Sequence, residues 1–291
     1  MERKIAAADG TLLSVRVTGR PVGEGGKPAL LLADGIGCDG YIWKYVRAAF
    51  EPHLTLVHLH HRGHGGSAIP SDRASLTVPQ LAADLWQVCD ALGVDRAILW
   101  GHSMGVQVTL HAAYLAPSRC AALLPTCGAF EKPLTTFRDS DVGTRLLPWV
   151  RRALAADSGR LRSAWRKLMP TDAAYWVAVA TEVNGRMIRR GDFLPYLDHL
   201  ADMDPSVFVD LLAAVAEHSA RPFLPALSMP ALVFAGSHDH FTPARLGAEL
   251  AQLLPAGELC VIPGGSHTAP LELPDLVQLR TEEFFKRNHL L

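Results

Sequence analysis

The chain has 291 residues, a formal net charge of −1 and 49% hydrophobic residues. The sequence has no basic stripe, so it lacks the charge pattern of proteins that bind nucleic acids or anionic membranes. No apolar run is long enough to span a bilayer. The five cysteines show neither metal nor disulfide spacing, and the charged N-terminus lacks the apolar stretch of a signal peptide. We therefore expect a cytoplasmic protein with a sizeable core, either a monomer or a homodimer.

Strands and helices alternate along the first part of the chain. Asp9-Gly10 predicts a hairpin between residues 4–8 and 11–18, and a Gly-rich loop follows over residues 18–27. Thr77 is the expected N-cap of a helix that Gly93 ends, with Gln80 as its capping-box partner. Further strands are predicted at residues 28–33, 54–59, 97–100 and 121–126, and further helices at 41–50 and 106–116. This alternation indicates a parallel sheet with helices on both faces.

The alternation stops over residues 128–227, which show only helical patterns, for example at 144–155, 173–184 and 205–217. It resumes with strands at 231–235 and 259–262 and helices at 244–254 and 274–287. We interpret residues 128–227 as a helical cap inserted into one core domain, residues 1–127 and 228–291, rather than as an independent helical domain. Among the cap's many aromatic residues, we expect Trp149, Trp176 and Phe208 to contact the substrate.

Gly101-His102-Ser103-Met104-Gly105 joins an apolar strand directly to a helix. A serine on such a sharp turn projects from the end of the sheet, and small residues are needed on both sides of it. The free amides at the start of the helix favour negative charge nearby. The pattern predicts a nucleophile elbow with Ser103 as nucleophile.

A serine hydroxyl needs a base, usually a histidine oriented by a carboxylate. The two later strands run into loops that contain Asp239 and His267. Because loops after parallel strands emerge at one sheet edge, Ser103, Asp239 and His267 are expected to converge as a catalytic triad. Glu131 is a rival acid, and His238 and His240 are weaker rivals for the base.

Two backbone amides must bind the oxyanion of the tetrahedral intermediate. We predict those of Met104, after the nucleophile, and Ile36, in the turn that follows residues 28–33. Gly35 and Cys38 flank this turn and are predicted substrate contacts, Cys38 as a packing residue and not as a second nucleophile.

These motifs resemble those of cap-bearing α/β-hydrolases, in the branch of bacterial esterases, carbon–carbon bond hydrolases and cofactor-free haloperoxidases. Besides the elbow, the similar motifs are Gly236-x-x-Asp239-x-x-x-Pro243, His267-x-x-x-x-Glu272-x-Pro274 and Arg62-Gly63-His64-Gly65-Gly66-Ser67. The resemblance implies a mostly parallel eight-stranded sheet flanked by helices. Serine at the elbow argues against haloalkane dehalogenase or epoxide hydrolase chemistry, for which the resemblance would imply aspartate.

The chain departs from the family pattern at two places. Asp34 precedes Gly35 where the family usually has histidine. Its carboxylate either props the oxyanion turn by hydrogen bonds, which we favour, or points into the hole and opposes the oxyanion. His60-His61 stands where the family tends to place an aspartate, which leaves the hydrogen bonding of the sheet's rim open.

Histidines 58, 60, 61 and 64 crowd one strand end and raise the alternative of a zinc hydrolase. Period-two geometry points them to different faces of the strand, so we expect neither a metal nor another cofactor. The predicted function is hydrolysis of small or medium acyl or aryl esters of a hydrophobic kind through an acyl-enzyme. Hydrolysis of carbon–carbon bonds, thioesters or lactones, or a ligand receptor with little turnover, are the alternatives.

Overall fold

The computed structural model describes residues 2–135, 142–156, 158–181 and 183–291. Its centre is one eight-stranded sheet with the strand order β1-β2-β4-β3-β5-β6-β7-β8. The strands are β1 (Glu2–Ala6), β2 (Leu12–Gly19), β3 (Ala29–Ala33), β4 (Thr55–Leu59), β5 (Ala97–His102), β6 (Cys120–Thr126), β7 (Ala231–Gly236) and β8 (Gly257–Ile262). Only the pairs β1–β2 and β2–β4 are antiparallel. The predicted mostly parallel sheet is confirmed.

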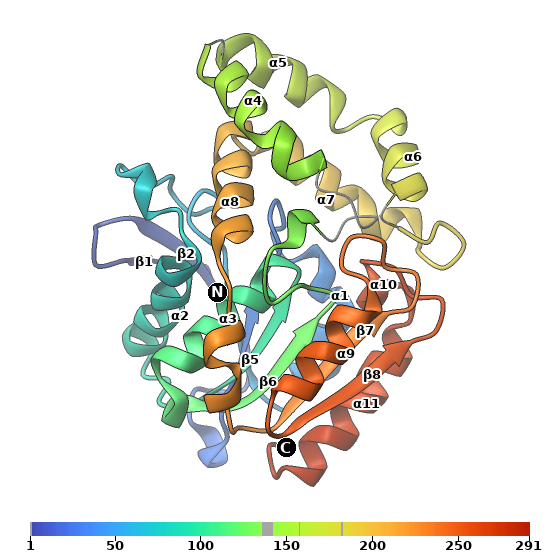
Figure 1. Ribbon diagram of the computed structural model, residues 1–291. Helices are drawn as coiled ribbons and strands as arrows, with labels where there is room; N and C mark the ends of the chain where they lie inside the picture. The colour runs from blue at the N-terminus through green and yellow to red at the C-terminus, as the bar shows by residue number, and fades with distance from the viewer. Residues whose placement is uncertain (1, 136–141, 157, 182) are drawn as a thin grey trace.

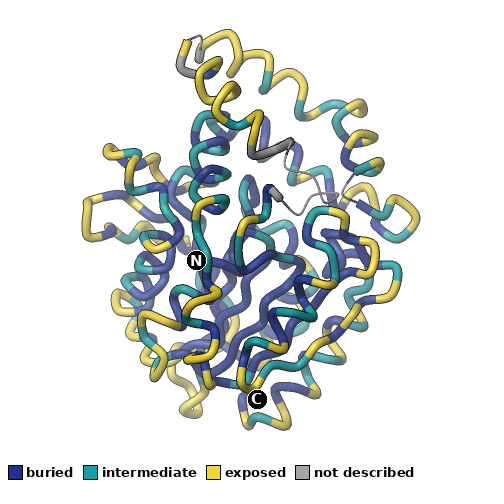
Figure 2. The backbone as a smooth tube through the Cα atoms, viewed as in Figure 1, coloured by how far each residue is buried: buried dark blue, intermediate teal, exposed yellow. Residues whose placement is uncertain are grey.

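Helices cover both faces of the sheet, because each buried strand presents apolar side chains alternately to either side. The helices that pack on the sheet outside residues 128–227 are α1 (Lys44–Phe50), α2 (Val78–Leu92), α3 (Met104–Leu115), α9 (Ala244–Leu253), α10 (Ala269–Glu272) and α11 (Pro274–Arg287). One core cluster joins the sheet to α2, α3 and α9, and the other joins it to α1, α10 and α11. Figure 2 shows these strands as the buried centre of the molecule.

Short 3₁₀ helices complete several connections: η1 (Glu24–Gly26), η2 (Tyr41–Trp43), η3 (Arg73–Ser75), η4 (Pro117–Arg119), η5 (Pro133–Thr135) and η7 (Arg221–Ala226). The helix predicted over residues 41–50 is therefore η2 followed by α1. Before α2, Thr77 accepts a bond from the Gln80 amide at 3.3 Å, as expected of an N-cap. The reciprocal half of the predicted capping box is wrong, because the Gln80 side chain donates instead to Asp84.

Among the described residues between β6 and β7 there are five α-helices: α4 (Val142–Ala156), α5 (Ser158–Leu168), α6 (Asp172–Thr181), α7 (Arg190–Asp202) and α8 (Pro205–Glu217). Figure 1 shows α4–α7 above the carboxyl ends of the strands, with α8 leading back down beside α3. The helix predicted at 173–184 ends early, at Thr181. The division of the chain at residues 127 and 228 stays a prediction.

Helix α8 ties this helical segment to the core. Val207 and Leu211 are completely buried and belong to the core cluster that contains α2 and α3. The Gln107 side chain of α3 donates to the Val215 carbonyl at 3.1 Å. None of the described helices has the combination of length and apolar character that crossing a membrane requires.

Candidate active site

Ser103 occupies the single residue between β5 and α3, with φ 56° and ψ −118°. Its amide donates to the Thr126 carbonyl of β6 at 3.1 Å, which pins the turn to the neighbouring strand. A Cβ at Gly101 would lie 2.2 Å from the Gly105 carbonyl oxygen, and a Cβ at Gly105 only 2.1 Å from that of Ala33. Strand and helix therefore cross so closely that both flanking positions require glycine, as the elbow pattern predicts.

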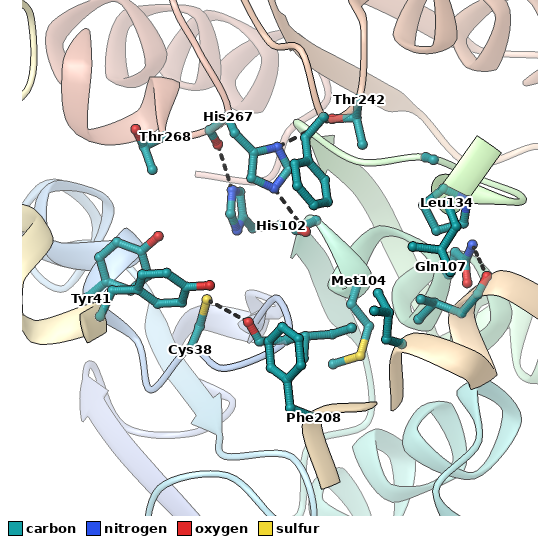
Figure 3. Close-up of a pocket in the computed structure, with 18 of the residues that line it drawn as sticks. Cys38, Tyr41, His102, Met104, Gln107, Leu134, Phe208, Thr242, His267 and Thr268 are labelled. Atoms are coloured by element: carbon teal, nitrogen blue, oxygen red, sulfur yellow. Dashed lines mark hydrogen bonds between the residues drawn. The ribbon is translucent and has the colours of Figure 1, made fainter. Parts of the chain in front are cut away.

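The structure brings the three predicted triad side chains together, although they come from loops after β5, β7 and β8. His267 Nε2 lies 3.0 Å from Ser103 Oγ, and His267 Nδ1 lies 2.9 Å from Asp239 Oδ2. Figure 3 shows the His267 ring at the wall of a cavity. The hydroxyl is therefore placed to give its proton to Nε2 while Asp239 holds the other side of the ring.

Asp239 is fixed by more than the histidine. The amides of Phe241 and Thr242 each donate to Asp239 Oδ1 at 2.8 Å, and the Thr242 hydroxyl donates to Oδ2 at 2.7 Å. Burial alone would raise the pKa of Asp239, but the facing His267 and the Thr242 donors outweigh burial and hold this pKa below its ordinary value. The carboxylate thus stays ionised and can accept a hydrogen bond from His267 Nδ1.

The amides predicted to form the oxyanion hole belong to residues that line the same cavity, Ile36 and Met104. Within the described chain neither amide has a hydrogen-bond acceptor, and Met104 opens α3, where amides lack helical partners. A Cβ at Gly35 would lie 2.9 Å from Ser103 Cβ, so the turn approaches the nucleophile closely. The next amide, that of Gly37, is bound by His64 Nε2 at 3.0 Å.

Asp34 props the oxyanion turn, as we favoured from the sequence. Its Oδ1 accepts from Trp43 Nε1 at 2.7 Å, and its Oδ2 lies 2.7 Å from His58 Nε2. Burial would raise the pKa of Asp34, yet His58 lowers it to about 2. Both oxygens of this charged group are therefore engaged by Trp43 and His58.

Three of the four crowded histidines bind separate partners. His58 faces Asp34, His60 Nδ1 accepts from the Gly66 amide at 3.0 Å, and His64 binds Gly37. Of the described residues, none forms a group of three ligand-type side chains suited to a metal ion.

Hydrogen bonds hold the sheet's rim at Arg62, although His60-His61 stands where the family tends to place an aspartate. Arg62, completely buried, makes two 2.7 Å bonds to Asp84 and one to Asp9. These two carboxylates, from α2 and from the first hairpin, neutralise the guanidinium.

The rival acid and bases lie elsewhere. Glu131 bonds to Arg221 at 2.7 Å and to Ser219 at 2.8 Å. His238 and His240 are exposed. The elbow spacer His102 is buried, and its Nε2 donates to the His267 carbonyl at 2.9 Å.

The cavity beside Ser103 has a volume of about 110 Å³ and a mainly apolar lining. Cys38 and Tyr41 lie at one end and Gln107 and Leu134 at the other, with Phe208 on the wall opposite His267 (Figure 3). Cys38 and Phe208 are therefore in place for the predicted substrate contact. Burial raises the pKa of the Cys38 thiol well above its ordinary value, which suits packing and not nucleophilic attack.

The prediction for Trp149 and Trp176 is corrected. These side chains are 67% and 63% exposed and do not line the cavity. Arg152 packs over the Trp149 ring on the outer face of α4. An aromatic residue in an amphipathic helix marks one face of that helix, and the spacing alone does not say which face meets the core.

Several cavity residues escaped the sequence analysis. Tyr41 of η2 stacks on Tyr196 of α7 at 5.1 Å, so one wall joins segments far apart in the chain. Phe241 and Thr242 also line the cavity. Their position just after Asp239 was a signal that could have identified them.

Comparison with known proteins shows the family and the fold of the chain. The sequence model of a family described as "alpha/beta hydrolase fold" matches residues 28–165 and 209–274. The chain belongs to this family. This α/β hydrolase is 24% identical over 271 residues to 3-oxoadipate enol-lactonase 1 of Acinetobacter baylyi, covering 93% of the chain and 92% of the relative.

Two further comparisons extend this result. The hydrolase is 31% identical over 251 residues to polyketide synthase ThaQ of Burkholderia thailandensis; this match covers 84% of the chain but only 11% of that much longer protein. The crystal structure of the enol-lactonase from Burkholderia xenovorans superposes with a TM-score of 0.76, at 24% identity, covering 98% of this chain and 100% of the other. That likeness shows the shared fold.

Proposed function

We propose that this α/β hydrolase cleaves small carboxylic esters through an acyl-enzyme on Ser103. The observation that carries the proposal is the continuous series Ser103 Oγ, His267 and Asp239, with contacts of 3.0 and 2.9 Å, at the wall of an apolar cavity. A nucleophile, a base and an orienting carboxylate within hydrogen-bond reach are the parts that acyl transfer needs.

In the first half of the reaction Ser103 Oγ attacks the ester carbonyl carbon while His267 Nε2 takes the hydroxyl proton. The carbonyl oxygen becomes an oxyanion, which the Ile36 and Met104 amides are proposed to bind. Collapse of this intermediate breaks the bond to the alcohol oxygen, and the imidazolium returns its proton to the departing alkoxide. Asp239 stabilises the imidazolium throughout and keeps the ring in one tautomer.

In the second half a water molecule takes the place of the alcohol. His267 removes its proton as it attacks the acyl carbon, and a second oxyanion forms in the same hole. Its collapse frees the carboxylic acid, and Ser103 recovers its proton from His267. The proposed steps use these side chains and amides together with water.

The cavity limits the size of the reacting group. Its volume of about 110 Å³ is smaller than the roughly 150 Å³ cavity that holds benzene in an engineered protein. Short acyl chains should fit, and long ones should meet the wall formed by Phe208 and Leu134. We therefore narrow the expectation from small or medium esters to small ones.

The direct test uses p-nitrophenyl esters of graded acyl length with the wild type and Ser103→Ala. The expected result is rapid turnover of the acetate and propionate that Ser103→Ala loses. Turnover retained by Ser103→Ala would contradict the proposal. Stable binding of esters without turnover by the wild type would instead support a ligand receptor.

A lactone hydrolase is the second candidate, favoured by the cavity's small volume and by the two enol-lactonase relatives. A lactone keeps its alcohol and acid in one molecule, so a small pocket need not hold a separate leaving group. Titrating the acid released from neutral five- and six-membered lactones separates the two candidates. A lactone kcat/KM well above that of p-nitrophenyl acetate would favour the lactone activity.

A further inference from the structure

Glu272 is a buried carboxylate beneath the loop that carries His267, and the proposed reaction does not use it. The residue is 6% exposed and ends α10, the short helix that follows the loop. A buried charge is stable only where hydrogen bonds or a counter-charge replace water. Its contacts therefore indicate what the carboxylate holds in place.

Both neighbours of His267 bind this carboxylate. The Ser266 amide donates to Glu272 Oε2 at 2.7 Å, and the Ser266 hydroxyl donates to Oε1. The Thr268 hydroxyl donates to Oε1 at 2.8 Å. The residues before and after His267 are thus both hydrogen-bonded to the Glu272 carboxylate. These bonds limit how far the imidazole can move from Ser103 and Asp239.

A fourth donor comes from the helical segment above the sheet. Asn184, between α6 and α7, donates its backbone N–H to Glu272 Oε1 at 2.9 Å and to Ser266 Oγ at 3.1 Å. Its side-chain Nδ2 donates to the Gly264 carbonyl at 2.9 Å. Asn184 therefore contacts the His267 loop at Ser266 and Gly264, and the Glu272 carboxylate beneath it.

The same stretch leads into the cavity wall. Val183 and Ile188 are buried on either side of Asn184 and belong to the core cluster that contains α1 and α11. Helix α7 begins at Arg190 and carries Phe193 and Tyr196, which line the cavity. A substrate that contacts α7 in the cavity is thus connected through Asn184 to the loop that carries His267.

We propose that Glu272 is a positioning residue for His267, and that Asn184 makes this positioning depend on how residues 183–188 sit against the loop. The inference rests on the proposed function, because it assigns His267 the role of base. A displacement of about 1 Å can lower a rate by about 100-fold, so modest loosening of the loop should be measurable.

The test compares Glu272→Gln, which keeps the shape but puts an amide in place of one carboxylate oxygen, with the exposed control Glu283→Gln on α11. In Glu272→Gln we expect kcat for p-nitrophenyl acetate to fall about 10- to 100-fold with KM changed less than about threefold. The acid limb of the pH profile of kcat/KM should move to lower pH, because an imidazolium held less well against Asp239 is less stable.

Asn184→Ala is the second variant, in case Glu272→Gln does not fold. It should lose about 3- to 10-fold in kcat and move the acid limb in the same direction. Asn184→Ala removes the Nδ2 bond to the Gly264 carbonyl and keeps the backbone donation to Glu272. The double variant should therefore lose more than Glu272→Gln alone. Glu283→Gln should match the wild type.

A folded Glu272→Gln with kcat within about twofold of wild type and an unchanged pH profile would overturn the proposal. Lower thermal stability with an unchanged profile would mean a purely structural role and would overturn it too. If Glu272→Gln does not fold, an unchanged profile in Asn184→Ala overturns it. Failure of the proposed function is distinct, since it shows as activity retained by Ser103→Ala or as no turnover by the wild type.

Discussion

The rim of the sheet around Ser103 and the segment α4–α6 above it differ in how closely the fold constrains them. At the rim, backbone atoms leave no room for a Cβ at Gly101 or Gly105. Along α4, by contrast, Leu154 is the one buried side chain among those described, and α5 has none. Packing in the core therefore constrains the residues around Ser103, whereas the sequence of much of α4 and α5 is free to vary. The predictions below test this contrast.

The largest effect is expected at Asp239. In Asp239→Asn the amide cannot hold His267 in the same tautomer, so kcat should fall by about 10⁴-fold. Steady-state kinetics on p-nitrophenyl acetate measure this loss, and the exposed Asp198→Asn serves as control. A loss below about tenfold would contradict the assigned role.

Gly105→Ala tests the constraint on the rim directly. The new Cβ would lie 2.1 Å from the Ala33 carbonyl oxygen, so we expect a loss of about 3 kcal/mol or more in the free energy of unfolding. Urea unfolding followed by circular dichroism measures it. Gly191→Ala in α7, where a Cβ meets nothing within 4 Å, should be neutral or slightly stabilising.

Buried histidines should make the rim sensitive to acid, whereas residues 142–181 contain no histidine. Burial lowers the pKa of His64 to about 3 and the pKa values of His60 and His102 to about 4, from 6.5. Between these two sets of pKa values the histidines are protonated in the unfolded chain and neutral in the native state. Stability should be complete above pH 6.5 and decline toward pH 4, by about 1.4 kcal/mol per pH unit for each such histidine.

Urea unfolding at pH 7, 6 and 5 measures this slope. His60→Gln should remove one histidine's share of it. A free energy of unfolding that stays constant between pH 7 and 5 would contradict the assignment of these three groups as neutral.

Phe208→Ala tests where the helical segment does affect the reaction. Opening the wall opposite His267 should lower kcat/KM for p-nitrophenyl acetate about tenfold and shift the preferred acyl chain to a longer one. A chain-length series measures the shift. Phe223→Ala, whose ring stacks on Tyr114 away from the cavity, should leave the preference unchanged.

The smallest effects are expected at Trp149 and Trp176. Both rings are mostly exposed, so their replacement by alanine should change kcat/KM less than about twofold. The same ester series detects any difference. A tenfold change in either variant would mean that the outer face of α4 or α6 takes part in substrate binding.

Local rules account for the parts of the site that the sequence predicts. The elbow needs only a strand, a helix and two glycines in close contact, and all of these are visible around Ser103. Asp239 and His267 were found because loops after parallel strands share one edge of the sheet. The oxyanion turn was predicted from its place after a strand. The propping role of Asp34 came from the family resemblance and from the need of a buried charge for a partner.

Contacts between distant segments were not predictable in this way. The stacking of Tyr41 on Tyr196 depends on how α7 sits over η2, which no local pattern specifies. The spacing of Glu272 after His267 was visible, but its partner Asn184 fell inside a predicted helix that in fact ends at Thr181. Helical periodicity could not find that end, because tertiary hydrogen bonds to the histidine loop compete with helix continuation there.

The backbone of Ser103 has a consequence for evolution as well as for chemistry. Its φ of 56° and ψ of −118° form a conformation that glycine adopts readily and that other residues adopt only when their surroundings impose it. A glycine at this position would make a more stable protein that, under the proposed function, has no nucleophile. Selection for durability alone would therefore remove the hydroxyl, and its presence in so unfavourable a conformation indicates that selection has acted on what the hydroxyl does.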